Sequence, residues 1–152
     1  MKLIEVIRPE AVNLNMSGTT KEEVLVQLVD LLAASGAIQN REAILESLIE
    51  REGLGSTGIG HGVAIPHGRC ADLDAPTVAL GRTLQDVDYD SIDGKPARLF
   101  FLLVAPENGS SEHLHLLAKI ARLMKDSSSR DQLFTASTPE AILKLISERD
   151  SG

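Results

Sequence analysis

The chain has 152 residues, is 43% hydrophobic and carries a formal net charge of −7. This composition suits one globular domain over residues 1–152, and no basic stripe offers a site for nucleic acid. Charges interrupt the first twelve residues, and no run approaches the roughly 20 apolar residues that span a bilayer, so neither a signal peptide nor membrane insertion is expected. The single cysteine, Cys70, excludes an internal disulfide framework and indicates a reducing, cytoplasmic location.

The first third of the chain predicts two helices after a short apolar opening at residues 3–7. Thr20 and Glu23 have the spacing of a capping box, apolar residues follow at helical spacing, and Gly36 ends the first helix. Asn40 is the expected N-cap of a second helix, which Gly53 ends. The apolar side chains expected on one face of that second helix are Ile44, Leu45, Leu48 and Ile49.

The rest of the chain predicts strands and then helices. Short apolar runs at residues 63–65, 77–83 and 98–105 lie between turn signals and read as strands. A helix is expected from Ser110 or Ser111 to about Lys125, and Thr138 followed by Pro139 predicts a last helix through Ile146. Two helices, then strands, then two or three helices predict an α+β fold of mixed α/β content. The expected architecture is a three-layer α/β/α domain with a central mixed sheet.

A glycine run, "GLGSTG" at residues 53–58, matches the dinucleotide-binding pattern G-x-G-x-x-G in its letters. That fingerprint follows a strand and opens a helix, whereas this run follows a helix and leads into a strand. No phosphate-binding loop of the G-x-x-x-x-G-K type occurs either. Two interpretations stay open: a connector that needs positive φ angles, or a loop whose backbone N–H groups approach an anion.

Two candidate functional residues flank this glycine run. His67 ends the stiff segment "VAIPH", because Pro66 fixes its own φ and biases the preceding residue toward an extended conformation. A histidine so placed suits a nucleophile or a ligand, although a structural role is commoner. Arg51 lies at the flank of the apolar stripe in the last turn of the second helix. It could bind a phosphoryl group bidentately, or simply favour the helix dipole.

A second pair of histidines, His113 and His115, lies in the helix expected to end near Lys125. At about 100° per residue, His113 falls beside the apolar face and His115 falls among charged residues on the opposite face. The two therefore cannot hold one metal ion, and no metal site is expected. His113 is expected inward in the first helical turn, either as a hydrogen-bonded core residue or beside an anion. His61 is expected to be solvated.

These motifs resemble the enzyme IIA domains of the bacterial phosphoenolpyruvate-dependent phosphotransferase system, in the mannitol and fructose class. The resemblance runs over nearly the whole chain, includes "HLHLLAKIARLM" at residues 113–124, and is greatest for the free-standing nitrogen-regulatory branch because of "GSTGIG" at residues 55–60. The positions that match the family signature are Glu52, Ile59, Gly60, Val63, Ala64, Ile65, Pro66, His67 and Gly68. His61 and Arg69 are departures, since relatives often have asparagine and lysine there.

The resemblance implies a phosphoryl carrier that accepts the group at Nε2 of His67, with Arg51, His113 and the loop amides holding the phosphoryl oxygens. The implied upstream partner is an HPr-like phosphocarrier, and downstream are regulatory target proteins or a IIB domain; no cofactor, metal or nucleotide is needed. Regulation is favoured over sugar transport because no transport domain is fused to the chain. A non-catalytic anion-binding module and a metal-dependent hydrolase are the alternatives from other classes.

Overall fold

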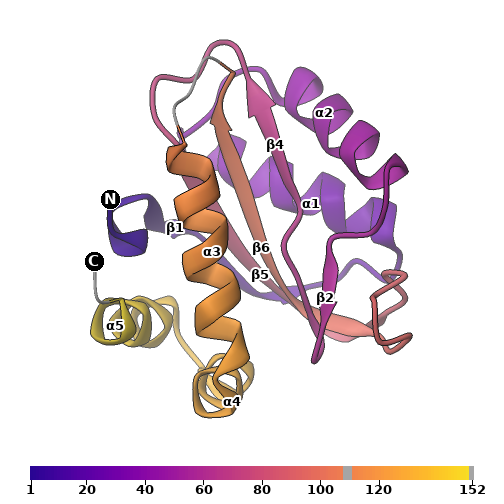
Figure 1. Cartoon of the computed structure of the whole chain (residues 1–152), viewed down its shortest axis with the longest axis vertical. Helices are drawn as coiled ribbons and strands as arrows, with labels where there is room; N and C mark the ends of the chain where they lie inside the picture. Colours follow the sequence, from indigo (N-terminus) through magenta and orange to yellow (C-terminus); the bar gives the residue numbers. More distant parts are fainter. Residues whose placement is uncertain (108–110, 151–152) are drawn as a thin grey trace.

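A six-stranded mixed sheet separates two layers of helices in the computed structural model, which describes residues 1–107 and 111–150 (Figure 1). The strand order is β1-β5-β6-β3-β2, and β4 also pairs with β6. The β1–β5, β3–β6 and β4–β6 pairs are parallel, whereas β5–β6 and β2–β3 are antiparallel. The strands are β1 (Ile7–Met16), β2 (Gly58–Gly60), β3 (Val63–Ala64), β4 (His67–Cys70), β5 (Thr77–Val87) and β6 (Ala97–Pro106).

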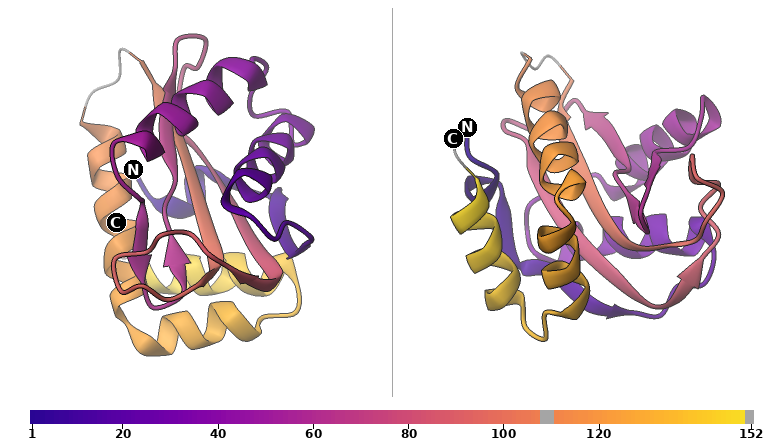
Figure 2. Two further views of the ribbon diagram at one scale, coloured as in Figure 1. Left: turned by 90° about the vertical axis from the view of Figure 1, so that its right-hand side faces the viewer. Right: turned by 60° about the horizontal axis from the view of Figure 1, so that its bottom comes forward.

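The helices lie on both faces of the sheet, as Figure 2 shows. One face is covered by α1 (Lys21–Ala34) and α2 (Arg41–Gly53), and the other by α3 (Glu112–Lys125), α4 (Ser127–Thr135) and α5 (Pro139–Arg149). A short 3-10 helix, η1 (Leu3–Glu5), precedes β1. The expected three-layer α/β/α arrangement with a central mixed sheet is confirmed. In the described part of the chain, no helix combines the length and the apolar character needed to cross a bilayer.

The two layers bury separate cores because successive side chains of a strand point to opposite faces. In β6, residues 99, 101 and 103 join the core under α3, α4 and α5, whereas residues 100, 102 and 104 join the core under α1 and α2. All six side chains are at most 1% exposed. This double burial explains the uninterrupted apolar run at residues 98–105, since both faces of the strand are covered.

The expected helix caps are present. Thr20, Asn40 and Thr138 each accept a hydrogen bond from the backbone N–H three residues later, at 3.1–3.2 Å. The Glu23 side chain accepts from the N–H of Thr19 rather than from that of Thr20, so the capping box is displaced by one residue. Gly36, with φ 82°, follows the end of α1 as predicted for a helix stop.

Several expected elements differ from the structure. Strand β1 was not predicted, because its charged residues and Pro9 interrupt the apolar pattern; as an edge strand it tolerates both. The observed β5 and α5 run past their predicted ends, and α4 is a third helix in the closing group. Ile49 is 54% exposed instead of lying on the buried face of α2. Ser110 lies outside the described residues, and Ser111 precedes α3 without a side-chain cap.

The two ends of the described chain lie together, and Figure 1 shows the indigo first turn of the chain near α5. Lys119, on α3, donates from Nζ to the carbonyl oxygen of Met1 at 2.8 Å and forms an ion pair with Asp150 at 3.0 Å. The backbone N–H of Leu3 also donates to the Asp150 carboxylate. The buried carboxylate of Asp150 thus joins the first turn of the chain, α3 and the end of α5.

Candidate functional site

A cavity of about 540 Å³ opens between the end of α2, strand β4 and the first turn of α3. The three residues singled out in the sequence, Arg51, His67 and His113, all line it. They come from positions far apart in the chain, and β4 and β6 bring them together because His67 pairs with Leu103 in the parallel ladder. Two imidazoles and a guanidinium therefore line the same cavity.

His67 is the first residue of β4 and is half-buried. The segment "VAIPH" is therefore divided between two strands, because β3 stops at Ala64 and β4 begins at His67. Its Nδ1 lies 2.9 Å from the carbonyl oxygen of Ile65. A carbonyl oxygen only accepts, so Nδ1 carries the proton and Nε2 keeps the free lone pair.

The electrostatic surroundings of His67 favour its neutral form. Burial lowers the pKa of His67, and the guanidinium of Arg51 lowers it further, while the Ile65 carbonyl and the Glu52 carboxylate act in the opposite direction. The net shift is downward from the ordinary value of 6.5. At neutral pH the imidazole is therefore uncharged, which is the form that can act as a nucleophile.

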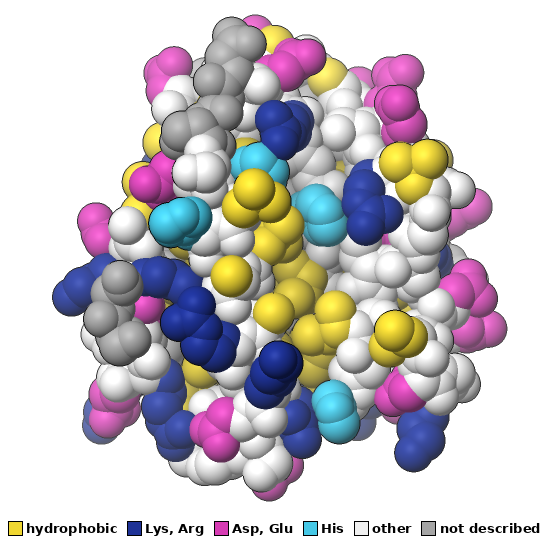
Figure 3. Space-filling model, in the orientation of Figure 1, with side chains coloured by type: hydrophobic (Ala, Val, Ile, Leu, Met, Phe, Trp, Pro, Cys, Tyr) yellow, Lys and Arg dark blue, Asp and Glu magenta, His cyan; other side chains and the backbone are white. Residues whose placement is uncertain are grey.

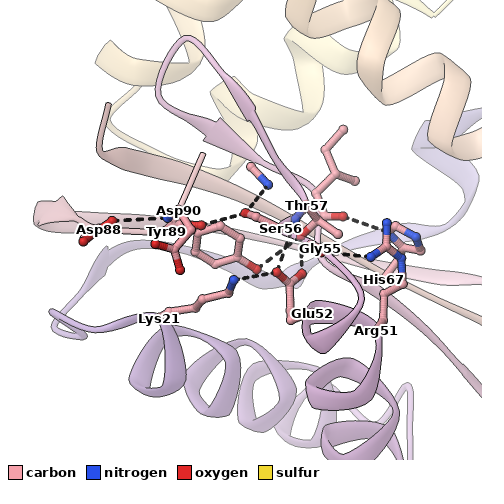
Figure 4. Close-up of polar contacts among 12 residues, drawn as sticks. Lys21, Arg51, Glu52, Gly55, Ser56, Thr57, His67, Asp88, Tyr89 and Asp90 are labelled. Atoms are coloured by element: carbon pink, nitrogen blue, oxygen red, sulfur yellow. Dashed lines mark hydrogen bonds and ion pairs between the residues drawn. The ribbon is translucent and has the colours of Figure 1, made fainter. Parts of the chain in front are cut away.

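Arg51 leaves α2 in its last turn, as the sequence predicted, and its Nη1 donates to the carbonyl oxygen of Gly55 at 2.9 Å (Figure 4). That hydrogen bond links the guanidinium to the loop after α2. Figure 4 shows Arg51 beside His67, whereas the side chain of the next residue, Glu52, points the other way. Both residues contact the loop after α2, but only Arg51 lines the cavity, whereas Glu52 pairs with Lys21.

Glu52 is the centre of a buried polar network that sequence reasoning did not find (Figure 4). Its side chain is 7% exposed and forms an ion pair with Lys21 at 2.9 Å. It also accepts hydrogen bonds from the N–H and the hydroxyl of Thr57. The Lys21 ammonium lies 4.6 Å from the centroid of the Tyr89 ring, and burial raises the pKa of the Tyr89 hydroxyl. The network fastens the loop after α2 to α1 and to the segment after β5.

The glycine run contributes little to the cavity wall. Of residues 53–60, only Leu54 lines the cavity. The N–H of Gly58 is donated to the side chain of Ser56, and a Cβ on Gly58 would lie 2.3 Å from the Ser91 hydroxyl. Gly60, the last residue of β2, has φ 92°. These contacts favour the interpretation of the run as a closely packed connector over that of an anion-binding loop.

His113 and His115 separate as the helical wheel predicted. His113 is half-buried and lines the cavity, whereas His115 is exposed. Within residues 1–107 and 111–150, no group of three histidine, cysteine or acidic side chains could hold a metal ion. The Nε2 of His113 lies 2.8 Å from the Nη2 of Arg69, a contact that the sequence did not indicate.

The other two residues considered from the sequence lie away from the cavity. His61 is exposed with φ 59°, and its backbone N–H donates to the carboxylate of Asp93 at 3.1 Å. Cys70 is a buried free thiol at the end of β4. Neither residue is among those that line the cavity with His67.

Exposed apolar side chains stand at the rim of the cavity. Leu54 is 83% exposed and Leu114 is 57% exposed, and both line it. Figure 3 shows hydrophobic side chains on this face, between histidine side chains and the side chains of lysine and arginine. Leu54 and Leu114 therefore place exposed apolar surface at the edge of the cavity.

Comparison with known proteins identifies the family of this chain. Residues 5–149 match the family model described as "Phosphoenolpyruvate-dependent sugar phosphotransferase system, EIIA 2". The chain is 36% identical to the nitrogen regulatory protein of Pseudomonas aeruginosa, over 100% of this chain and 99% of that one. It is 37% identical to the fructose-specific EIIABC component of Bacillus subtilis, over 99% of this chain, but spans only 24% of that longer protein.

The fold agrees with a solved structure of a relative. The nitrogen regulatory protein IIA-Ntr from Neisseria meningitidis superposes with a TM-score of 0.87 at 37% sequence identity, covering 94% of this chain and 97% of that one. The fold and the family match together identify the family of this chain. The chain belongs to the EIIA type-2 family of the phosphoenolpyruvate-dependent sugar phosphotransferase system, whose members are phosphotransferase components that accept phosphoryl groups on histidine.

Proposed function

We propose that His67 is the phosphoryl acceptor of this protein, through its Nε2 atom. One observation carries the assignment: the Nδ1–H of His67 is donated to the carbonyl oxygen of Ile65 at 2.9 Å, so the lone pair stays on Nε2. The lowered pKa of His67 keeps that nitrogen unprotonated at neutral pH. The family requires a histidine nucleophile, and His67 supplies one in the required protonation state.

The donor in this proposal is a phosphohistidine on an HPr-like carrier protein. The N–P bond on the carrier breaks while the bond between phosphorus and Nε2 of His67 forms, and the electron pair of the broken bond returns to the carrier imidazole. The His67 ring gains the positive charge that the carrier ring gives up, and its Nδ1–H stays in place. The Ile65 carbonyl then accepts a charge-assisted hydrogen bond, which is stronger than a neutral one.

Arg51 and His113 are proposed to hold the phosphoryl oxygens. Phosphoryl transfer passes through a loose transition state whose charge lies on three oxygens, so positioned donors supply most of the catalysis. The hydrogen bond from Arg51 to Gly55 uses one of its five N–H groups and leaves others for the phosphoryl group. His113 lines the same cavity from the opposite side, on α3.

The carrier protein is proposed to dock on the rim formed by Leu54 and Leu114. Both side chains are exposed and both line the cavity, so a protein that covers them also excludes water from His67. A downstream partner that receives the phosphoryl group must reach the same nitrogen and therefore uses the same rim. The proposal includes a cytoplasmic location, to which the free thiol of Cys70 is suited.

We propose a regulatory output, in which target proteins respond to the phosphorylation state of His67. The chain matches the Pseudomonas nitrogen regulatory protein almost from end to end, and the Neisseria IIA-Ntr structure superposes over 94% of it. The second candidate is a fructose-type EIIA that passes the group to a IIB domain, favoured by the identity with the Bacillus protein. The two candidates share the acceptor and differ only in what receives the phosphoryl group.

The test supplies phosphoenolpyruvate, enzyme I and either a sugar-type or a nitrogen-type carrier, and follows the labelled phosphoryl group. Wild type and the control His61→Ala are expected to be labelled, because His61 is exposed and lies outside the cavity. His67→Ala is expected to stay unlabelled; label that persists on it would refute the acceptor. Efficient onward transfer from labelled wild type to a sugar-specific IIB domain would replace the regulatory output with the transport one.

A further inference from the structure

Arg69 makes a contact that ties β4 to the second histidine of the cavity. It lies two residues after His67 and is exposed to solvent. Its Nη2 lies 2.8 Å from Nε2 of His113, and its Nη1 lies 3.5 Å from the carbonyl oxygen of Glu107. The guanidinium therefore bridges β4, the end of β6 and the first turn of α3.

The chemistry of this contact fixes the proton on His113. A guanidinium has only donors and keeps its charge in proteins, so Nε2 of His113 must accept. The imidazole is then neutral and carries its proton on Nδ1. That nitrogen is buried and has no hydrogen-bond partner among residues 1–107 and 111–150. The two histidines of the cavity are thus both Nδ1–H tautomers, each fixed by a different neighbour.

We propose that Arg69 is a positioning residue, which acts through His113 by holding that ring neutral in the Nδ1–H tautomer before the phosphoryl group arrives. This inference rests on the proposed function of the cavity. The contact with Arg69 preorganises the His113 ring, which then keeps one tautomer and one orientation during transfer. The ring is thereby held at a set position in the cavity wall, because the guanidinium that contacts it also contacts the Glu107 carbonyl.

The first test measures the tautomer itself in unphosphorylated protein. The nitrogen chemical shifts of the His113 ring, recorded by long-range proton–nitrogen correlation, distinguish a protonated Nδ1 from a protonated Nε2. Wild type is expected to show Nδ1–H. Arg69→Met is expected to lower the ratio of Nδ1–H to Nε2–H at least about tenfold, because a hydrogen bond to a charged donor is lost. Arg69→Lys, which keeps a donor-only cation, is expected to restore most of the ratio.

The matched control is Arg122→Met, which makes the same substitution at an exposed position on the helix that carries His113. It is nine residues further along, or about 13 Å at about 1.5 Å per residue. It is expected to leave the His113 nitrogen shifts unchanged. Unchanged shifts in Arg69→Met, or equal changes in the two methionine variants, would overturn the inference.

The second test separates positioning from docking. Phosphoryl acceptance by Arg69→Met is expected to fall about tenfold at saturating carrier, with little change in the carrier concentration that gives half the maximal rate. A loss confined to that half-saturating concentration would make Arg69 a docking residue and overturn the inference. The tautomer measurement needs no phosphoryl transfer, so an unlabelled wild type would refute the proposed function while the nitrogen shifts still decide the role of Arg69.

Discussion

Gly58→Ala tests whether the glycine run is a packed connector. A Cβ on Gly58 would lie 2.3 Å from the hydroxyl of Ser91 and 2.9 Å from its Cα and Cβ. Carbon atoms ordinarily pack about 3.5 Å apart or more, so each carbon contact is about 0.6 Å too short. Rotation of the hydroxyl cannot relieve the contact with the Cα, and the backbone must move. Such overpacking costs about 1–3 kcal/mol.

The assay is urea unfolding of purified variants, with the slope of the transition checked for constancy. Gly58→Ala is expected to lower the free energy of unfolding by about 1–3 kcal/mol, seen as a lower urea midpoint. The control is Gly53→Ala at the end of α2, where no atom lies within 4 Å of an added Cβ. It is expected to be neutral or more stable by up to about 1 kcal/mol.

The outcome also decides what the loop amides do. Folded Gly58→Ala is expected to accept phosphoryl groups as fast as wild type, since only Leu54 of residues 53–60 lines the cavity. A Gly58→Ala variant as stable as Gly53→Ala, yet slow to be phosphorylated, would refute the packing argument. It would also restore the interpretation of the glycine run as an anion-binding loop.

Three further predictions follow from the site. The pKa of His67 is lowered in the folded protein, so as the pH falls below 6.5 the unfolded chain protonates this imidazole before the folded chain does. Wild type should therefore lose more stability on acidification than His67→Gln. Urea titrations of both proteins across this pH range measure the losses, and equal losses would contradict the prediction. Glu52→Gln should lower the free energy of unfolding by about 1.5–3 kcal/mol because it weakens the ion pair with Lys21. The control Glu46→Gln, at an exposed position, should leave the free energy of unfolding unchanged. Equal free energies for the two variants in urea unfolding would show that the Glu52 network does not stabilise the fold. Leu114→Asp should raise the half-saturating carrier concentration about tenfold without changing the urea midpoint; an unchanged concentration would move the docking surface elsewhere.

Most of the fold could be predicted because its signals are local. Side-chain caps at Thr20, Asn40 and Thr138, together with apolar periodicity, fixed the starts of three helices to the residue. Strand β1 escaped prediction because an edge strand can carry charges and Pro9 that a central strand excludes. The strand order could not be read, since β4 and β3 both pair with β6 through contacts distant in the sequence.

The members of the cavity could be predicted, but their hydrogen bonds could not. The helical wheel separated His113 from His115 and put Arg51 at the flank of the apolar stripe, and the family resemblance grouped both with His67. The contact between Arg69 and His113 depends on how α3 crosses the end of β4, which no local pattern encodes. The network around Glu52 could not be predicted for the same reason, because Lys21 and Tyr89 come from two other parts of the chain.

The two ends of the described chain lie close together, so this fold is suited to insertion into a longer protein. Met1 and Asp150 meet through Lys119, so a polypeptide that leads into residue 1 and one that continues from residue 150 would start from the same corner of the molecule. Such a unit can be inserted into a longer protein, or circularly permuted by a short linker between those ends, without opening the sheet. The Bacillus relative, of which this chain matches 24%, is a longer protein of the kind that adjacent ends accommodate.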